Sequence, residues 1–422
     1  MRYLPLSAQD REDMLSTSGA KNIRALYEDV PDSAYNDALI PTLPAHKTEM
    51  AVEKHLVRYS NQNIDAAHAP FFLGAGVYNH HIPASVDYVI QRSEFLTAYT
   101  PYQPEIAQGT LQVIYEFQTM IAKLTGQDVA NASLYDGATA LAEAALMAMR
   151  VTRKNKVIIA NDINPDYQET LSTYLKDDAI VDADTSDDIA AIIIQSPDFY
   201  GRPEKYLAWR KKADALGALL VVVITEIISL GMLPAPDMAD IVCGEGQSIG
   251  LPMSFGGPHL GFFACRNDYL RQMPGRLCGK TVDADGKDSY VLTLSTREQH
   301  IRRDKATSNI CTNQGLCALA FTVHMALLGD LGFRQLAQLN HERAVMLADK
   351  LSAVKGIAVE NETFFNEFVI TLPENAEKVV NTLAAQGIIA GLPLNDNRLL
   401  ICATEKTEDA DMDILIEALS TL

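Results

Sequence analysis

The stretch LLVVVITE, at residues 219–226, decides the fold class. Its first six residues are apolar and mostly β-branched, with no alternating polar residues, which is typical of a strand buried on both faces of a sheet. Comparable short runs occur at 156–160, 189–194, 240–243 and 261–265, and helical stretches such as 206–216 separate some of them. Short buried strands alternating with helices predict an α/β fold with a mostly parallel sheet.

The sequence on either side of this core predicts two further parts of the chain. Residues 1–65 predict an N-terminal helical arm of short helices and loops, and residues 66–325 predict the large α/β domain. The pattern changes after about residue 325, where strands and helices are predicted at 332–354, 365–371, 374–386, 388–391, 399–403 and 409–419. We therefore expect a small C-terminal α+β domain over residues 326–422.

The overall composition excludes several classes of partner. The 422 residues are 48% hydrophobic and carry a formal net charge of −19, and this acidity disfavours nucleic acid and anionic membranes as partners. No apolar signal core begins the chain and no run of 18 apolar residues follows, so we expect no membrane span and a cytoplasmic protein. The six cysteines are dispersed and form no CxxC pair. The adjacent pair His80 and His81 diverges on a helix or a strand, so we expect no metal site.

The segment SLYDGAT, at residues 133–139, opens a predicted Ala-rich helix. A helix N-terminus presents free N–H groups and a partial positive charge, and a glycine lets the backbone approach an anion closely. Asp136, Gly137 and Thr139 are therefore candidates for a phosphate cup. The pattern is equally that of an ordinary capped helix that packs through small residues.

Two further features follow the predicted strands at the same edge of the sheet. Glu226 ends the 219–226 stretch, where open α/β sheets place their ligands, so it either pairs with a protonated pyridine nitrogen or starts a helix. The loops at 244–248 and 255–259 follow the next strand. No lysine occurs between Lys212 and Lys280, so these loops offer no primary amine for an imine with a cofactor.

The segment EFLTAYTPYQPE, at residues 94–105, is dense in polar groups and is stiffened by prolines. It belongs to a loop-rich region, and long irregular segments in compact proteins are usually functional or packed against a partner. Its candidate site residues are Thr97, Tyr99, Thr100, Tyr102, Gln103 and Glu105. The alternative is an interface loop without chemistry.

The segment TREQHIRRDKATSN, at residues 296–309, concentrates four cations. Arginine in a polar loop suits recognition of carboxylate or phosphate. Arg303, Lys305 and Asn309 are candidates for substrate binding, and a salt-bridged linker between domains is the alternative.

Several of these segments together resemble the glycine decarboxylase family, the P-protein of the glycine cleavage system. The resemblance covers nearly the whole chain and lies in the N-terminal half of that family, which is one long chain in some organisms and two subunits in others. The matching strings are FFLGAGVYNHHIP (71–83), EFLTAYTPYQPEIAQG (94–109), NASLYDGATALAEAA (131–145), FGGPH (255–259) and TREQHIRRDKATSNICTN (296–313). The resemblance implies subunit 1 (alpha) of the split form.

The resemblance also implies a fold and a chemistry. The fold is type I of the enzymes that depend on pyridoxal phosphate (PLP), the aminotransferase fold, with a large α/β domain and a small C-terminal domain. Gln247 stands at the position of the cofactor lysine, and Glu226 stands where aspartate is more usual. PLP is then expected in a lysine-bearing partner, subunit 2 (beta), of an alpha2-beta2 heterotetramer.

The implied activity of that complex is decarboxylation of glycine with transfer of the aminomethyl group to the lipoyl arm of the H-protein. We expect residues 97–105 to complete the partner's site, with Arg303, Lys305 and Asn309 positioning a substrate carboxylate or a loop. Two alternatives stay open: a structural scaffold subunit that contributes no site residue, and a self-sufficient PLP decarboxylase that uses Lys280 or Lys305.

Overall fold

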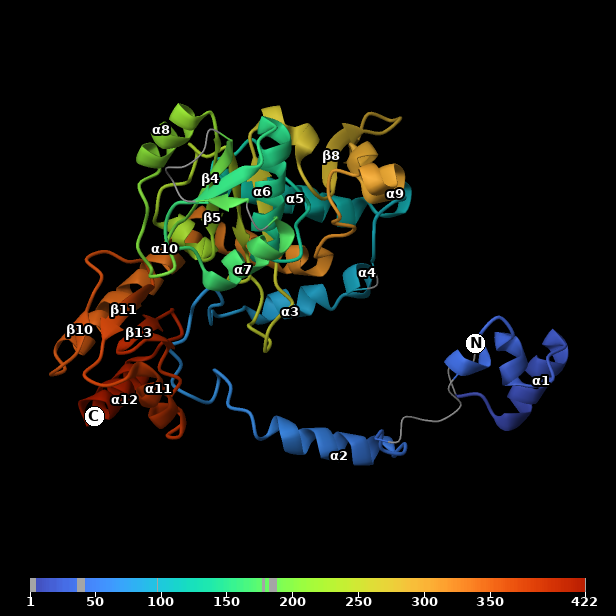
Figure 1. Ribbon diagram of the computed structural model, residues 1–422, viewed down its shortest axis with the longest axis horizontal. Helices are drawn as coiled ribbons and strands as arrows, with labels where there is room; N and C mark the ends of the chain where they lie inside the picture. The colour runs from blue at the N-terminus through green and yellow to red at the C-terminus, as the bar shows by residue number, and fades with distance from the viewer. Residues whose placement is uncertain (1–4, 36–41, 97, 177–178, 182–187, 422) are drawn as a thin grey trace. The chain divides into compact units, whose positions relative to one another are not determined.

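The computed structural model describes residues 5–35, 42–96, 98–176, 179–181 and 188–421, and the chain divides into two compact units, Met1–Ile64 and Asp65–Leu422 (Figure 1). In the first unit, helix α1 (Ala8–Ser18) is capped by Ser7, whose hydroxyl accepts from the Asp10 N–H at 3.1 Å. Two short 3-10 turns, η1 (Ile23–Tyr27) and η2 (Asp32–Ala34), and helix α2 (Glu49–Ser60) follow. None of the described residues of these four elements is buried.

A seven-stranded sheet forms the centre of the second unit, in the order β1-β7-β6-β5-β4-β2-β3. Its strands are β1 (Val129–Ala130), β2 (Lys156–Ile159), β3 (Ile180–Val181), β4 (Ile189–Gln195), β5 (Leu219–Ile224), β6 (Ile241–Glu245) and β7 (Gly261–Cys265). Strands β2 to β6 are parallel, whereas β7 runs antiparallel to β6 and β1 runs antiparallel to β7. The predicted α/β class is confirmed, and the sheet is mostly parallel as expected.

The side chains of the central strands alternate between two cores, because successive strand residues point to opposite faces. Leu220, Val222 and Ile224 of β5 pack into one core, and Val221 and Val223 pack into the other. Helices α5 (Gln108–Thr125), α8 (Tyr206–Leu216) and the first part of α10 (Gly315–Ser352) contribute to the first core. Helices α6 (Gly137–Thr152) and α7 (Pro165–Tyr174) contribute to the second. This burial on both faces explains the continuous apolar runs.

A four-stranded antiparallel sheet, in the order β10-β11-β13-β12, organises the C-terminal part. Its elements are β10 (Ala358–Val359), β11 (Glu367–Thr371), α11 (Ala376–Ala384), β12 (Leu392–Asn395), β13 (Arg398–Cys402) and α12 (Asp409–Ser420). All of them except β12 pack with the end of α10 into a separate core that also includes Phe72. The chain therefore contributes a segment from before the large sheet to the core of the small one.

Helix α10 connects the two cores. It consists of two helical parts that meet at a kink at Gly329, whose dihedrals are not helical, and the predicted helix 332–354 corresponds to the second part. One window of 18 residues in α10 is long and apolar enough to span a membrane, and half of that window is buried inside the protein. Phe321 and Phe333 of this helix belong to the core of the large sheet, so α10 serves here as a core helix.

The remaining elements lie around the large sheet. They are helices α3 (Ala84–Ile90), α4 (Ser93–Leu96) and α9 (Gln299–Arg302), the short turns η3 (Pro104–Ile106), η4 (Ile227–Gly231), η5 (Asn267–Gln272), η6 (Ser295–Arg297) and η7 (Arg303–Lys305), and the hairpin β8 (Leu277–Val282) and β9 (Asp288–Thr293). The hairpin was not predicted, because Lys280, Thr281 and Val282 are exposed and give no apolar run.

Candidate functional site

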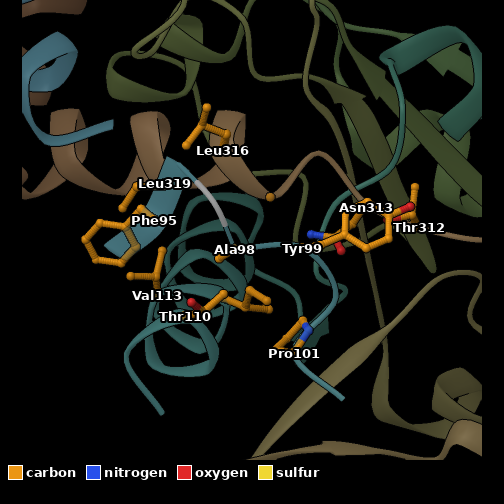
Figure 2. Close-up of a pocket in the computed structure, with 12 residues that line it drawn as sticks. Phe95, Ala98, Tyr99, Pro101, Thr110, Val113, Thr312, Asn313, Leu316 and Leu319 are labelled. Atoms are coloured by element: carbon orange, nitrogen blue, oxygen red, sulfur yellow. The ribbon is translucent and has the colours of Figure 1, made fainter. Parts of the chain in front are cut away.

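The polar loop after α4 borders a cavity of about 180 Å³ between α5 and the start of α10. Figure 2 shows Tyr99 beside Thr312 and Asn313 at this cavity, with Phe95 and Val113 on its apolar side. Tyr99 is 82% exposed despite lining the cavity. The predicted site residue Thr97 lies outside the described residues.

Most of the predicted residues of this loop have exposed side chains. Tyr99, Gln103 and Glu105 are exposed, and among the described residues their side chains have no hydrogen bond or ion pair. Thr100 differs, because its hydroxyl oxygen is buried and has no hydrogen-bond partner in the part of the chain that the structure describes. The loop thus offers polar groups that the described part of the chain does not use.

Tyr102 is held by Arg276, a residue that sequence reasoning missed. Arg276 is 3% exposed and donates from Nη2 to Tyr102 Oη at 3.2 Å and to the Cys311 carbonyl at 2.7 Å, and from Nη1 to Thr312 Oγ1 at 3.1 Å. Its Nε lies 3.5 Å from Glu298 Oε2. The planar guanidinium can serve several acceptors at once, so it fixes the polar loop to the 296–313 segment.

The 296–313 segment is also bonded to the start of α6. Asn313 Nδ2 donates to the Ala132 carbonyl at 3.1 Å, and the Gln314 N–H donates to Ser133 Oγ at 3.0 Å. The Cys311 N–H donates to Tyr135 Oη at 3.2 Å. Three segments that were identified separately in the sequence therefore meet at one junction.

The predicted residues Arg303, Lys305 and Asn309 are exposed beyond this junction. In the described ranges neither Arg303 nor Lys305 takes part in an ion pair, and Arg303 has a left-handed φ of 54°. His300, in the same segment, stacks edge-on against Tyr102 with ring centroids 5.7 Å apart. The structure thus connects this segment to the polar loop through His300 and Arg276.

A second polar region lies where β5 and β6 end, and it begins with the candidate phosphate cup. Asp136 caps α6, because its Oδ1 accepts from the Thr139 N–H at 2.7 Å. The Gly137 N–H donates to Glu245 Oε2 at 3.0 Å, and a side chain at Gly137 would collide with Tyr167. Two of the donors at this helix N-terminus, the N–H groups of Gly137 and Thr139, are therefore used by carboxylates of the chain itself.

Glu245 lies beside that helix end, and Gln247 follows it two residues later. Glu245 also accepts from the Leu260 N–H at 2.7 Å and from the Gln247 N–H at 3.1 Å, and burial raises the pKa of Glu245 to about 7. Gln247, the residue at the expected lysine position, donates to the Leu251 carbonyl at 2.7 Å and to the Tyr78 carbonyl at 3.2 Å. Its Oε1 accepts from the Tyr78 N–H at 3.1 Å, so the whole amide is engaged.

Glu226 follows β5 and is paired with a histidine. Its Oε1 accepts from the Ile228 N–H at 2.9 Å, so it starts η4, and its Oε2 lies 2.9 Å from His80 Nε2. The other ring nitrogen of His80 lies 2.8 Å from Glu405 Oε2. Burial by itself lowers the pKa of His80, but the carboxylates of Glu226 and Glu405 outweigh it and raise the pKa to about 10.

These residues do not fit PLP as a resident cofactor of this chain. A PLP site needs an amine for the imine, free donors for the phosphate and an acid facing the ring nitrogen. Here the expected lysine position holds Gln247, whose amide is already hydrogen-bonded. The N-terminus of α6 faces the Glu245 carboxylate, and Glu226 is paired with His80. Lys280 pairs with Asp288 on the exposed part of the β8–β9 hairpin, and Lys305 is exposed on η7.

Comparisons with known proteins identify the relatives of this chain. The family described as "Glycine cleavage system P-protein" matches residues 1–419. A protein of Maricaulis maris named "Probable glycine dehydrogenase (decarboxylating) subunit 1" is 54% identical, with 100% of this chain and 99% of the relative covered. A protein of the same name from Beijerinckia indica is 53% identical over the same shares.

Solved structures agree with these sequence matches. A glycine decarboxylase (P-protein) of the glycine cleavage system, crystallised in inhibitor-bound form, has a TM-score of 0.92 and 40% identity, with both chains fully covered. Mouse CSAD in apo form has a TM-score of 0.67 at 14% identity over 90% of each chain, which shows the shared fold alone. The predicted type I fold of PLP-dependent enzymes is confirmed. The chain belongs to the glycine cleavage system P-protein family.

Proposed function

We propose that this chain is the subunit of a split glycine dehydrogenase (decarboxylating) that does not carry the cofactor lysine. Together with its partner it decarboxylates glycine and passes the aminomethyl group to the lipoyl arm of the H-protein. The end-to-end match to proteins named subunit 1 supports this function, together with the engaged amide of Gln247 at the expected lysine position. PLP is bound by the lysine-bearing subunit 2, in a cytoplasmic alpha2-beta2 heterotetramer.

The division of labour within the chain follows from this proposal. The arm (1–65) and the large (66–325) and small (326–422) domains are the parts of this chain, which assembles with subunit 2. Asp136, Gly137 and Thr139 are the remnant of a phosphate cup whose donors the chain now uses internally. The bonds from Gly137 to Glu245 and from Thr139 to Asp136 support that reading.

The polar loop completes the active site of subunit 2 from across the interface. This role is supported by the exposed side chains of Tyr99, Gln103 and Glu105, which lack partners among the described residues. It is also supported by the anchoring of Tyr102 on a buried arginine, because a catalytic group gains from being held in a fixed orientation. Thr97 and Thr100 complete the set.

Arg303, Lys305 and Asn309 have a secondary role in holding a substrate carboxylate or ordering the loop. This role is supported by the exposure of Arg303 and Lys305, which have no ion pair within the described residues, and by the contact of His300 in the same segment with Tyr102. Guanidinium and ammonium groups are suited to a carboxylate such as that of glycine.

The first experiment is exchange of carbon between glycine and bicarbonate, with PLP and lipoylated H-protein present. We expect activity only when the purified chain is mixed with subunit 2. Activity of the chain alone would contradict the proposal, because it would require a lysine of this chain to hold the cofactor.

The second experiment tests the loop in the reconstituted mixture. We expect Tyr102→Phe and Glu105→Gln each to lower the exchange rate, by up to about 100-fold if the group takes part in proton transfer. Glu94→Gln is the matched control, because Glu94 is an exposed carboxylate of the same region that already pairs with Arg92 at 2.7 Å. Unchanged rates in both loop variants would instead favour a scaffold subunit that contributes no site residue.

A further inference from the structure

The bridging segment, residues 71–83, crosses the edge of the large sheet where the parallel strands end. Its even-numbered residues from 72 to 80 are buried, and the odd-numbered residues between them are half-buried. The Phe72 N–H donates to the Ile389 carbonyl at 2.8 Å, and the Phe72 carbonyl accepts from the Cys402 N–H at 2.9 Å. A side chain at Gly74 would collide with Glu367, so this segment is built into the interior.

The bridging segment contacts two of the three positions that hold a cofactor in PLP enzymes. The Tyr78 backbone makes hydrogen bonds through both its N–H and its carbonyl to the amide of Gln247. The His80 ring is hydrogen-bonded to the carboxylate of Glu226, as a protonated pyridine nitrogen would be. The third position, the N-terminus of α6, is filled by Glu245, which is only two residues before Gln247.

The same segment is bonded to the small sheet on its other side. Glu405 lies 2.8 Å from His80 Nδ1 and accepts from the His81 N–H at 2.6 Å. Glu367 accepts from the Ala75 N–H at 2.6 Å and from Tyr78 Oη at 3.1 Å. His80 therefore stands between a carboxylate that follows β5 of the large sheet and one that follows β13 of the small sheet.

We infer that the bridging segment is an intramolecular occupant of the cofactor cleft, which fills the cleft together with Glu245 and holds the small sheet against the large one. The cleft is closed by these groups and not only by the loss of a lysine. An amine placed at position 247 would still meet a carboxylate at the helix N-terminus and a histidine on Glu226.

The bridging segment is expected to stay in the cleft, because its removal would leave buried charged groups without partners. The side chains of His80 and Glu226 are 1% and 2% exposed, and that of Glu405 is 9% exposed. Burying a charge without a partner is costly, whereas the paired and hydrogen-bonded arrangement is tolerated. An incoming cofactor would have to break these pairs before it could form its own contacts.

The direct test restores the lysine in the full chain, without subunit 2. Gln247→Lys is compared with the triple variant Gln247→Lys, Glu245→Ser, His80→Ala, and with Gln272→Lys as a control for a new exposed lysine. Each protein is incubated with PLP, reduced with borohydride and mapped by peptide mass. The readout is the pyridoxyl label at position 247, which does not depend on catalytic activity.

We expect no label at position 247 in the single variant and a clear label there in the triple variant, with a visible absorption band before reduction. Labelling of the single variant would overturn the inference, because the cleft would then be open. Absence of label from both variants would also overturn it, because the named groups would not be what closes the cleft.

A second measurement covers the case in which the triple variant does not fold. Cys402 packs against Gly74, where an added Cβ would lie 2.8 Å from the Cys402 Cβ, and is 3% exposed. Cys243 is fully buried in β6. We expect His80→Ala to raise the rate of native-state thiol labelling at Cys402 by at least about tenfold and to leave Cys243 protected, because local opening leaves the sheet intact. His81→Ala, at the exposed neighbouring position, is the control. Equal labelling of both cysteines, or no change at Cys402, would contradict the inference.

Discussion

The guanidinium of Arg276 donates to the hydroxyl of Tyr102 at 3.2 Å, although the two residues are 174 positions apart in the chain. Arg276 also lies over the Tyr102 ring, at 5.4 Å from its centroid, and bonds the backbone at Cys311. The exposed polar loop is thus fixed to the protein by a buried cation. Arg276 therefore holds the loop in place, while the exposed residues of the loop stay free to act on a partner.

Replacing Arg276 should therefore impair the complex through the loop. We expect Arg276→Lys to cost about 1 kcal/mol of unfolding free energy and to lower the exchange rate of the reconstituted mixture by about tenfold, because an ammonium cannot bond in the planar fork. Arg276→Leu should cost about 3–5 kcal/mol, because the buried Glu298 loses its guanidinium neighbour and keeps only the more distant His300. Denaturant unfolding and glycine–bicarbonate exchange measure the two effects.

A double-mutant cycle separates positioning from general stability. Arg276→Lys combined with Tyr102→Phe should show a coupling of about 0.5–1 kcal/mol in the activation free energy. Arg271→Lys, at an exposed arginine nearby, is the control and should change neither quantity. Strict additivity of the two variants would show that Arg276 does not act through Tyr102.

The sequence predicted the elements whose pattern is set by burial. The apolar run 219–224 is β5, because a strand buried on both faces is apolar throughout, and the predicted helix 206–216 is α8, because its apolar residues recur with the helical period. The predicted start of the long helix at 332 lies close to Gly329, whose non-helical dihedrals kink α10 into two helical parts, and only the first part, from Gly315, was not predicted. Gly329 adopts a positive φ that a helix interior does not, so the glycine marks the kink between the two helical parts.

The partners of the polar residues could not be predicted in the same way. The sequence did not decide whether Glu226 faces a cofactor or starts a helix. In the structure it starts η4 and pairs with His80, 146 positions away. Arg276 carried no signal, because it follows Pro274 and Gly275 outside any periodic segment. Such pairings depend on which loops the fold brings together, which no local pattern records.

The pair formed by His80 and Glu405 predicts a specific dependence of stability on pH. Because the pKa of His80 is raised from 6.5 to about 10 in the folded protein, its stabilising contribution is complete below about pH 6.5 and is lost as pH rises toward 10. Glu405 has its pKa lowered to about 2 despite burial, because of His80, so its contribution is lost only as pH falls from about 4.5 toward 2. His324, which also faces this pair, has its pKa lowered to about 4 by burial.

We therefore expect His80→Phe to cost about 3–5 kcal/mol of unfolding free energy at pH 6, and distinctly less at pH 9.5. Denaturant unfolding across this range measures the difference, and His81→Phe is the neighbouring control. A cost that did not shrink between pH 6 and pH 9.5 would show that His80 stabilises the fold by packing and not by charge.

Glu367 should show a pH dependence in an overlapping window but of different origin. Burial raises its pKa from 4.5 to about 8, so its protonated form is favoured in the folded protein and stability falls as pH rises from about 4.5 to 8. Glu367→Gln keeps an oxygen for the Ala75 N–H and never ionises. We expect this variant to gain on the order of a few kcal/mol relative to the unmodified chain between pH 5 and pH 9, measured by unfolding at both values. A constant difference would mean that Glu367 remains in one protonation state throughout.

The exposed apolar side chains of the N-terminal unit predict where subunit 2 binds. Met50 and Leu56 of α2 are 75% and 59% exposed, and no described residue of α2 is buried. Large exposed apolar groups gathered on one element are typical of an interaction surface.

We expect Met50→Ser with Leu56→Ser to change the unfolding free energy of the isolated chain by less than about 0.5 kcal/mol. The same variant should weaken association with subunit 2 by about tenfold or more, because two anchoring side chains are lost. Lys54→Ser, on the same helix, is the matched control, and sedimentation of the mixture measures the affinity. Equal affinity of the double variant and the control would show that α2 does not contribute to the interface.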